Sequence, residues 1–345
     1  MIFMEKKVLS VVIPTYNMET LLERCLYSLV IDSAILSKVE IIVVNDGSKD
    51  SSLLIASEFQ KKYPESTIII DKENGNYGSC INQAIKQATG KYIKILDADD
   101  SFVTSSFRSF VQNLSHIDAD MILTDFMVYN QNSKTSEVIS YKDMYGISSD
   151  KNIPVDSFFA EYPNYYGRMH GVTYRLSLLR QMGYHQTEGI SYTDQEWVLY
   201  PMKYIKNIYY LHLPLYIYNI GREGQTIFLK SKCFDQLVFV TKKLCDFYEN
   251  NINDHKKLIN YYYNQIFKQV DLIYYLGLFE DFSLSSKVRS VDEYLKSHSL
   301  YGMTNELTRC RIKYVKLWRL CGYSKLPKWY LLLERIVKKI VKSKI

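Results

Sequence analysis

Two aspartates separated by one small residue are the strongest candidates for metal chemistry in this chain. Asp97, Ala98 and Asp99 follow the run Lys91–Leu96, which has the character of a buried strand. Carboxylates at this spacing can share one hard divalent cation and leave coordination positions open for phosphate oxygens. Such a cation would offset the charge that builds up on a departing diphosphate. Ordinary turns and helix caps also contain this tripeptide, so on its own it is a weak indication of a site.

Two further polar clusters follow neighbouring predicted strands. One follows the strand predicted at 8–13, which Pro14 ends, and comprises Thr15, Tyr16 and Asn17. The other follows the strand predicted at 40–44 and contains Asp46. An acid there could accept a hydrogen bond from a nucleobase N–H, and the ring of Tyr16 could stack on the base. Each cluster is compatible with a turn, but three on one sheet edge favour a binding site, because ligands bind beyond the carboxyl ends of parallel strands.

Strand and helix patterns alternate through the first 120 residues, which predicts an α/β protein. We expect a Rossmann-like, mostly parallel central sheet flanked by helices, with right-handed crossovers between the strands. The first helix is expected to begin with a capping box formed by Thr20 and Glu23. The other expected elements are strands at 67–70, 91–96 and 121–129 and helices beginning near 50 and 79.

Beyond residue 120 the alternation is weaker, and beyond about residue 230 the pattern is helical. We expect a polar, loop-like segment at 130–155 and helices near 173–182 and 194–204. A boundary near residue 230 would separate an α/β catalytic domain, 1–230, from a helical C-terminal region, 231–345, that ends in a basic amphipathic segment.

The net charge of +6 is unevenly distributed. Residues 309–345 hold twelve Lys or Arg and one acid, whereas the rest of the chain is mildly acidic. This argues against a nucleic-acid-binding protein, which would carry its positive charge on a binding face. From residue 329 onward, apolar and basic side chains would occupy different sides of a helix, as in helices that lie on an anionic membrane. A helix packed on the body of the protein, or a frayed basic end, is the alternative.

Other features bear on where the protein works. No secretion signal follows Met1, no apolar run is long enough to span a bilayer, and the six cysteines form no CxxC pair. We therefore expect a cytoplasmic protein that is peripheral on the inner face of a plasma membrane. Self-association into a homo-oligomer is left open. The 31 tyrosines serve either as core and interface packing or as platforms for sugar rings.

Five motifs occur in one order over roughly the first 110 residues: Val11–Asn17, Ile42–Asp50, Asn74–Gly78, Ala88–Ile93 and Leu96–Asp100. In sequence and spacing they resemble the family 2 glycosyltransferases. The resemblance implies a GT-A fold, an inverting transfer from a nucleotide-sugar, and Mn²⁺ or Mg²⁺ as cofactor. It implies that the base is held by Thr15, Tyr16 and Asp46. Asp99 would be the direct metal ligand, and Asp97 would approach the ribose or the metal. The remaining contacts with the nucleotide-sugar are expected at Pro14, Asn17, Asn74, Gly78 and Ala98.

The second half resembles the family less closely but contains further candidates. Asp194, at the start of the helix predicted at 194–204, is expected to be the base that deprotonates the acceptor. Glu196 is the competing base, and a helix cap is the structural alternative for Asp194. His170 falls where the family shapes the donor-sugar or acceptor pocket, and a purely structural histidine is the alternative.

Arg222 and Gln225 lie in a segment, 218–226, that resembles the late loop of non-processive family members. They could close over the diphosphate, with the arginine making a charge-assisted contact to phosphate. A solvated loop is the alternative. The processive branch of the family is not matched, because the chain has neither a QxxRW motif nor membrane-spanning runs.

These features predict an inverting, metal-dependent glycosyltransferase in bacterial cell-surface polysaccharide synthesis, such as capsule or exopolysaccharide assembly. UDP is the expected nucleotide, and a saccharide or lipid-linked saccharide is the expected acceptor. One alternative is a sugar nucleotidyltransferase, which would need a Gly-rich loop with Arg and Lys after the first strand that this chain lacks. Another is a catalytically silent scaffold, against which the intact acidic set argues.

Overall fold

The computed structural model describes residues 7–222, 233–252, 257–308 and 312–325. The chain divides into two compact units, one drawn from residues 1–229 and 251–262 and the other from residues 230–250 and 263–345. Residues 251–262 thus pack with the first unit although they follow the boundary expected near residue 230. That boundary, as the limit of a catalytic domain, stays a prediction.

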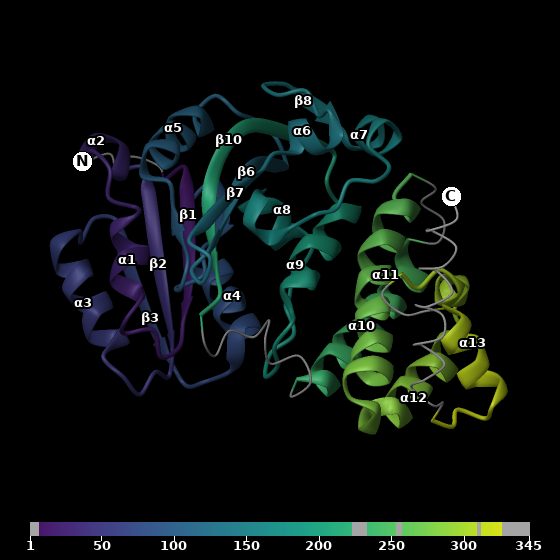
Figure 1. The fold of residues 1–345 in the computed structure, drawn as a ribbon. Coiled ribbons are helices and arrows are strands. Elements are labelled where there is room, and N and C mark those ends of the chain that lie inside the picture. The colour runs from purple at the N-terminus through teal and green to yellow at the C-terminus, as the bar shows by residue number, and fades with distance from the viewer. Residues whose placement is uncertain (1–6, 223–232, 253–256, 309–311, 326–345) are drawn as a thin grey trace. The chain divides into compact units, whose positions relative to one another are not determined.

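A ten-stranded mixed sheet forms the centre of the first unit (Figure 1). Its main path runs in the order β3-β2-β1-β4-β9-β6-β10-β5, with β7 beside β6 and β8 beside β10. Strands β1 to β4 are parallel to one another, β9 is antiparallel to both its neighbours, and β10 is parallel to β6. The expected α/β class is therefore confirmed. The strands are β1 Leu9–Thr15, β2 Val39–Asp46, β3 Thr67–Lys72, β4 Tyr92–Ile95, β5 Ser101–Phe102, β6 Met121–Asn130, β7 Thr135–Ile139, β8 Asn152–Pro154, β9 Val172–Arg175 and β10 Asn207–Ile220.

Helices cover both faces of this sheet. Helices α1 and α3 pack together along one face, and α4 packs on the other face against β1 and β2, with α8 beside it (Figure 1). Because β1 and β2 are covered on both faces, they consist of nearly continuous apolar residues. The helices are α1 Leu22–Tyr27, α2 Ser33–Leu36, α3 Ser52–Lys62, α4 Asn76–Gln87, α5 Thr104–Leu114, α6 Tyr141–Tyr145, α7 Val155–Glu161, α8 Leu176–Gln181 and α9 Asp194–Leu199, with 3₁₀ segments at Met169–Gly171 and Tyr200–Lys203.

Strand register brings the three polar clusters to one edge of the sheet. At the ends of β1, β2 and β3, Thr15 pairs with Asn45, and Asp46 pairs with Lys72. Strand β4 pairs with β1 on its other side and ends two residues before Asp97. The expectation that these clusters share one sheet edge is confirmed.

The start of α1 differs from the expected capping box. The helix begins after Leu21, and neither Thr20 nor Glu23 forms a side-chain cap there. Instead the preceding residue, Glu19, exchanges hydrogen bonds with the loop before α3. Its N–H donates to Asp50 and its carboxylate accepts from the N–H of Ser51, both at 2.9 Å. A tertiary contact between two loops thus replaces the local cap.

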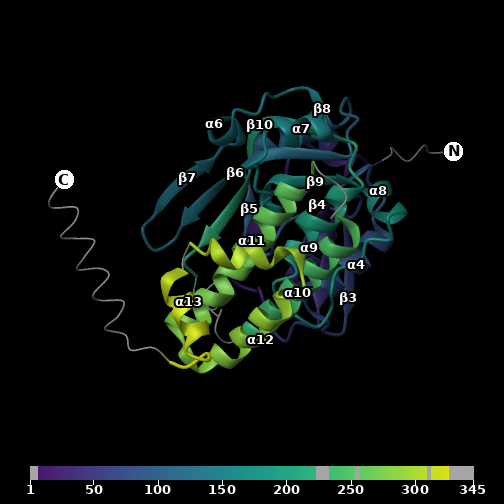
Figure 2. The same cartoon turned by 90° about the vertical axis from the view of Figure 1, so that its right-hand side faces the viewer.

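After residue 130 the sequence patterns mislead in three places. The segment 130–155, expected to be loop-like, contains β7, α6 and β8, and β6 and β7 form a hairpin (Figure 2). The helix expected at 173–182 begins only at Leu176, because the preceding residues pair with β4 and β6 as β9. The long strand β10 is not predicted at all. It is held by pairing with β6 along most of its length, and local periodicity does not encode such pairing.

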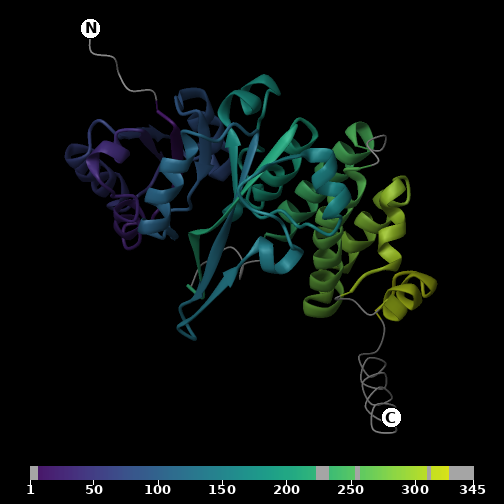
Figure 3. The same ribbon diagram turned by 90° about the horizontal axis from the view of Figure 1, so that it is seen from above.

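The second unit is helical, which confirms the expected helical C-terminal region (Figure 3). Its helices come from α10 Phe234–Asn251, α11 Ile259–Tyr275, α12 Ser285–Leu295 and α13 Ile312–Leu320. Asp292 of α12 is fully buried and joins three of them, accepting hydrogen bonds from Tyr274 of α11 and from Arg319 of α13. Pairing is needed because a buried, unpaired carboxylate costs several kcal/mol.

Two findings concern a membrane. In the described part of the chain, no helix combines the length and the apolar character needed to cross a bilayer. The amphipathic segment expected near the C-terminus falls mostly within 326–345, which lie outside the described residues.

Candidate active site

Three aspartates crowd the carboxyl end of β4. The three are Asp97, Asp99 and Asp100, and one carboxylate oxygen from each lies within 4.8 Å of the others. Asp100 is buried and accepts hydrogen bonds from the hydroxyl of Tyr216, at 2.6 Å, and from the backbone N–H of Asn219, at 2.7 Å. Asp100 therefore anchors β10 to the end of β4, and Asp97 and Asp99 are the pair positioned to meet a ligand.

Burial and mutual repulsion disfavour the charged forms of these acids. The pKa of Asp97 is raised to about 7, first by burial and then by the charge of Asp99. The pKa of Asp100 is raised well above its ordinary value for the same two reasons. A hard divalent cation would relieve this repulsion, and a donor set made of carboxylate oxygens suits Mn²⁺ or Mg²⁺. The residues present therefore fit the expected cofactor, through Asp97 and Asp99.

Two arginines bring positive charge to the same place. Nη2 of Arg222, which follows β10 closely, lies 2.8 Å from Oδ2 of Asp99. Nη2 of Arg24, on α1, donates to the backbone oxygen of Asp99 at 2.5 Å. Arg222 was expected near the diphosphate, whereas Arg24 was not predicted, because its contact with the loop after β4 joins residues far apart in the chain. Gln225 lies outside the described residues.

The loop after β1 presents an exposed tyrosine ring between two polar residues that form hydrogen bonds within the protein. Tyr16 is 46% exposed, so its ring is accessible to a nucleobase. The hydroxyl of Thr15 instead donates to the backbone oxygen of Ile13 inside the protein, at 3.1 Å. Asn17 adopts φ +52° and accepts a hydrogen bond from the N–H of Lys49 at 2.8 Å, which joins this loop to the one after β2. Tyr16 thus offers a stacking surface, while Thr15 and Asn17 set the shape of the loop.

Asp46 is buried at the end of β2 and paired with a lysine that the strand patterns did not reveal. Nζ of Lys72, at the end of β3, lies 2.5 Å from Oδ1 of Asp46, and the N–H of Gly75 donates to the same oxygen at 2.9 Å. Asn74 donates to the backbone oxygen of Asp46, also at 2.9 Å. Lys72 therefore offsets the cost of burying this carboxylate and holds it in one orientation.

Two other residues predicted to contact the nucleotide-sugar, Pro14 and Ala98, have no polar side chain. Pro14 is the penultimate residue of β1 and pairs with Val44 of β2. Ala98 is 2% exposed and lies between the two acids. Any contact that these residues make with a nucleotide-sugar would involve their backbone or apolar surface, and it stays a prediction.

Helix α4 connects the donor side of the site to the segment that leads to Asp194. Gly78, in its first turn, has no room for a side chain, because a Cβ there would lie 2.0 Å from the backbone oxygen of Thr187. The side chain of Asn82 exchanges hydrogen bonds of 2.8 and 2.9 Å with the backbone of Gln186. The structure therefore gives Gly78 a packing role, and its contact with the donor stays a prediction.

Asp194 is the first residue of α9. Its negative charge helps to raise the pKa of both Asp97 and Tyr77. Burial raises the pKa of Asp194 itself, while hydrogen bonds from Gln195 and from backbone N–H groups at the helix start act in the opposite direction. The N-cap of α9 is Thr193, and no side-chain cap hydrogen bond forms there. The role of Asp194 as the base stays a prediction.

Glu196, the competing candidate, is committed to the fold. Its Oε2 accepts a hydrogen bond from the N–H of Thr187 and its Oε1 accepts one from the hydroxyl of Thr187, both at 2.6 Å. The residue is fully buried. A carboxylate held in this way cannot turn to meet an acceptor hydroxyl, which argues against Glu196 as the base.

Aromatic side chains form a wall beside the acids. This aromatic wall consists of Phe126, His170, Tyr216 and Tyr218. The ring centroid of His170 lies 4.3 Å from that of Tyr218 and 4.9 Å from that of Tyr216. Burial and the charges of Lys94 and Arg168 lower the pKa of His170 to about 3, so its imidazole is neutral. His170 therefore lies near the site, and its contact with a sugar stays a prediction.

Lys94, which the sequence patterns did not single out, supports the aromatic wall from within. It lies on β4 and is fully buried, and its Nζ donates to the backbone oxygens of His170 at 2.9 Å and Val172 at 3.2 Å. Burial lowers its pKa to about 7. Among the described residues no carboxylate forms an ion pair with it. Two carbonyl groups thus take the place of a counter-ion.

The fold and the site define a class of protein. A mostly parallel sheet ends in a pair of acids that suits a divalent cation, as in GT-A glycosyltransferases. Residues 10–185, more than half of the chain, match the family model described as Glycosyl transferase family 2. The chain belongs to this family, which confirms the resemblance seen in its motifs.

Three similar proteins extend this result. The chain is 27% identical over 230 residues to an uncharacterized glycosyltransferase of Mycoplasma genitalium, which covers 64% of this chain and 70% of that protein. It is 45% identical over 94 residues to a poly(ribitol-phosphate) beta-glucosyltransferase of Bacillus spizizenii, which covers 27% of this chain and 15% of that protein. Its structure is similar to that of S. aureus TarS in complex with UDP-GlcNAc, with a TM-score of 0.60 and 18% identity over 87% of this chain and 82% of that chain. The structural likeness shows the shared GT-A fold.

Proposed function

We propose that this glycosyltransferase transfers a sugar, with inversion, from a UDP-sugar to a hydroxyl of a saccharide or lipid-linked acceptor in cell-surface polysaccharide synthesis. The observation that carries the proposal is the cluster of Asp97, Asp99 and Asp100 at the carboxyl end of β4. Asp194, whose charge adds to the raised pKa of Asp97, is the proposed base. Inversion in one step needs a base for the incoming hydroxyl and a separate charged site for the departing diphosphate. The similarity to a poly(ribitol-phosphate) glucosyltransferase supports a polymeric acceptor, and the fold shared with UDP-GlcNAc-bound TarS supports UDP.

In the proposed reaction, Asp194 accepts the proton of the acceptor hydroxyl while the hydroxyl oxygen attacks the anomeric carbon. The bond from that carbon to the diphosphate oxygen breaks, and the nucleoside diphosphate leaves with the electron pair. Attack opposite the leaving group inverts the anomeric configuration. Arg24 and Arg222 lie beside Asp99, where guanidinium groups would bind the diphosphate. Mn²⁺ or Mg²⁺, which Asp97 and Asp99 would hold, supplies Lewis-acid stabilisation of the leaving group.

Other residues are proposed to bind the nucleobase, the sugar and the membrane. On the donor side, Tyr16 would stack on the base, and Asp46 would bind it beside Lys72. The sugar would lie against the aromatic wall, where the neutral His170 can act as hydrogen-bond donor or acceptor. The basic residues from 309 onward would bring the enzyme to the anionic inner face of a bacterial plasma membrane, where lipid-linked acceptors are found.

The proposal is tested by replacing the base. With a panel of UDP-sugars, Mn²⁺ and a polyol-phosphate or lipid-linked acceptor, release of UDP should depend on the metal and stop on chelation. Asp194→Asn should lower turnover by about 10²- to 10⁴-fold, the usual contribution of a general base, and leave UDP affinity within about twofold. Asp156→Asn, which changes an exposed acid of the same unit, is the matched control and should behave as wild type. Full turnover by Asp194→Asn would refute the assigned base, and a folded protein that turns over no UDP-sugar would favour another nucleotide or a silent scaffold.

The pH dependence of turnover offers a second test of the base. Because burial raises the pKa of Asp194, its ionised form should be lost on acidification at a pH above the value near 4 that is usual for aspartate. We therefore expect turnover under saturating substrates to fall on the acid side, with an apparent pKa above 4. An acid limb at or below 4 would contradict this assignment.

A further inference from the structure

Tyr77, in the first turn of α4, contacts the carboxylate of Asp97. Its hydroxyl donates to Oδ1 of Asp97 at 2.9 Å and lies 3.7 Å from the sulfur of Met169. One O–H proton serves one acceptor at a time, and a nearby carboxylate is a much stronger acceptor than a thioether. The hydrogen bond to Asp97 therefore prevails, and it restrains one of the two oxygens of that carboxylate.

The turn that carries Tyr77 is itself firmly held. The backbone oxygen of Gly75 accepts a hydrogen bond from the N–H of Gly189 at 2.8 Å. Gly78 packs directly on the backbone of Thr187, with no space for a side chain. The start of α4 is thus joined to Asp97 through the side chain of Tyr77. It is joined to the segment before Asp194 through the backbone of Gly75 and Gly78.

We propose that Tyr77 is a positioning residue, whose hydrogen bond to Oδ1 holds the carboxylate of Asp97 in the orientation in which it would bind the divalent cation of the nucleotide-sugar site. This inference rests on the proposed metal site at Asp97 and Asp99. A carboxylate with one restrained oxygen loses its rotation about the Cβ–Cγ bond before the cation arrives, so less conformational entropy is lost on binding. Groups that orient a metal ligand in this way affect affinity by about 10- to 100-fold when they are removed.

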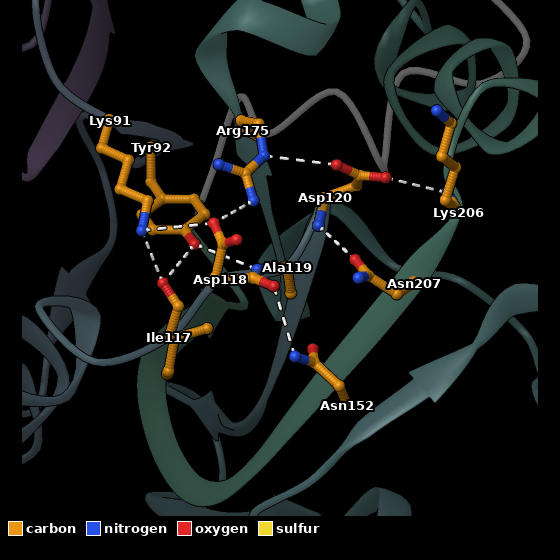
Figure 4. Close-up of polar contacts among 10 residues, drawn as sticks. All are labelled: Lys91, Tyr92, Ile117, Asp118, Ala119, Asp120, Asn152, Arg175, Lys206 and Asn207. Carbon is orange, nitrogen blue, oxygen red and sulfur yellow. Dashed lines mark hydrogen bonds and ion pairs between the residues drawn. The ribbon is translucent and has the colours of Figure 1, made fainter.

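The chain contains a matched control at the opposite end of β4. Tyr92 is buried, and its hydroxyl donates to the backbone oxygen of Ile117 at 2.8 Å and accepts from the N–H of Ala119 at 3.2 Å (Figure 4). Tyr92→Phe and Tyr77→Phe each remove one hydroxyl and its hydrogen bonds near the same strand. A general loss of stability would appear in both variants, whereas a loss of metal positioning would appear only in Tyr77→Phe.

The test measures Mn²⁺ binding to the full chain by electron paramagnetic resonance of the free ion, with and without UDP. We expect Tyr77→Phe to raise the Mn²⁺ dissociation constant about tenfold, and Tyr92→Phe to leave it within about twofold. Steady-state kinetics should show the same division: the Mn²⁺ concentration for half-maximal rate rises in Tyr77→Phe, whereas the KM for the acceptor does not change.

A third variant separates this inference from the proposed function. If Asp99→Asn loses Mn²⁺ binding but Tyr77→Phe binds the ion as wild type does, the positioning role is wrong and the metal site stands. If the two tyrosine variants weaken binding equally, the effect is structural and the positioning role is again wrong. If Asp99→Asn binds Mn²⁺ normally, the metal site itself is wrong, and the role of Tyr77 falls with it.

Discussion

The two ends of strand β4 gather acids under opposite electrostatic conditions. Beside its amino end, Arg175 lies 2.7 Å from Asp118 and 3.2 Å from Asp120, and Lys91 lies 3.5 Å from Asp118 (Figure 4). Each acid there faces a cation. At the carboxyl end, Asp97, Asp99 and Asp100 lie close to one another, and Arg24 and Arg222 contact only Asp99 among them in the contacts described above.

The pKa values report this difference. The hydrogen bond and charge of Arg175 lower the pKa of Asp118 below its ordinary value, whereas burial and the charge of Asp99 raise that of Asp97 to about 7. The first arrangement favours the folded state, and the second opposes it. Acids held together against their mutual repulsion are characteristic of a functional site, because a ligand supplies the missing positive charge. Two of the following predictions compare the ends of β4, and one concerns the middle of the strand.

The largest effect is expected on activity. Asp99→Asn should lower kcat/KM for the nucleotide-sugar by about 10³-fold, because a metal ligand that stabilises leaving-group charge contributes several kcal/mol to the transition state. Asp118→Asn, at the other end of the strand, should leave kcat/KM within about twofold. Initial rates of UDP release measure both. Equal losses in the two variants would remove the distinction between the ends.

The middle of β4 should respond to pH. The pKa of Lys94 is lowered to about 7 in the folded state, so the folded protein binds fewer protons than the unfolded chain between pH 7 and about 10. This group therefore opposes folding fully below pH 7, and its penalty declines as the pH rises towards 10. We therefore compare the free energy of unfolding of Lys94→Met with that of wild type at each pH. The difference, variant minus wild type, should be about 3 kcal/mol larger at pH 7 than at pH 10.

Urea unfolding of both proteins at the two pH values gives this difference, because all other titrating groups are shared and cancel. A stability difference between Lys94→Met and wild type that does not change with pH would show that Lys94 stays charged in the folded protein.

The smallest effect is expected on stability at the two ends. Asp120 accepts hydrogen bonds from Arg175 at 3.2 Å and from the N–H of Lys206 at 2.9 Å. Asp120→Ala should therefore lower the free energy of unfolding by about 1–3 kcal/mol. Asp99→Ala, which removes a repulsive charge, should leave it unchanged or raise it slightly. Equilibrium unfolding in urea without metal measures both, and a larger loss for Asp99→Ala would reverse the comparison.

The sequence alone was sufficient to predict the strands with a clear apolar pattern and the polar residues that directly follow them. The strands β1, β2 and β4 can be recognised from their own residues, because strands buried on both faces need apolar residues at nearly every position. The polar residues that follow them, among them Tyr16, Asp46 and Asp97, could therefore be located, and the parallel arrangement placed them on one edge. These local features predicted the α/β class and a donor site at this edge.

Only the tertiary structure decided which partners each of these residues has. Asp46 is paired with Lys72 through the register of β2 and β3, and Asp100 is committed to β10, a strand that local periodicity did not predict. Likewise, Asp97 accepts a hydrogen bond from Tyr77 of α4. The segment before Asp194 is held against the same helix by the hydrogen bond from Asn82 to Gln186. Each of these contacts joins residues far apart in the chain. Residue type and spacing specify what a side chain can do, but strand register and helix packing determine what it meets.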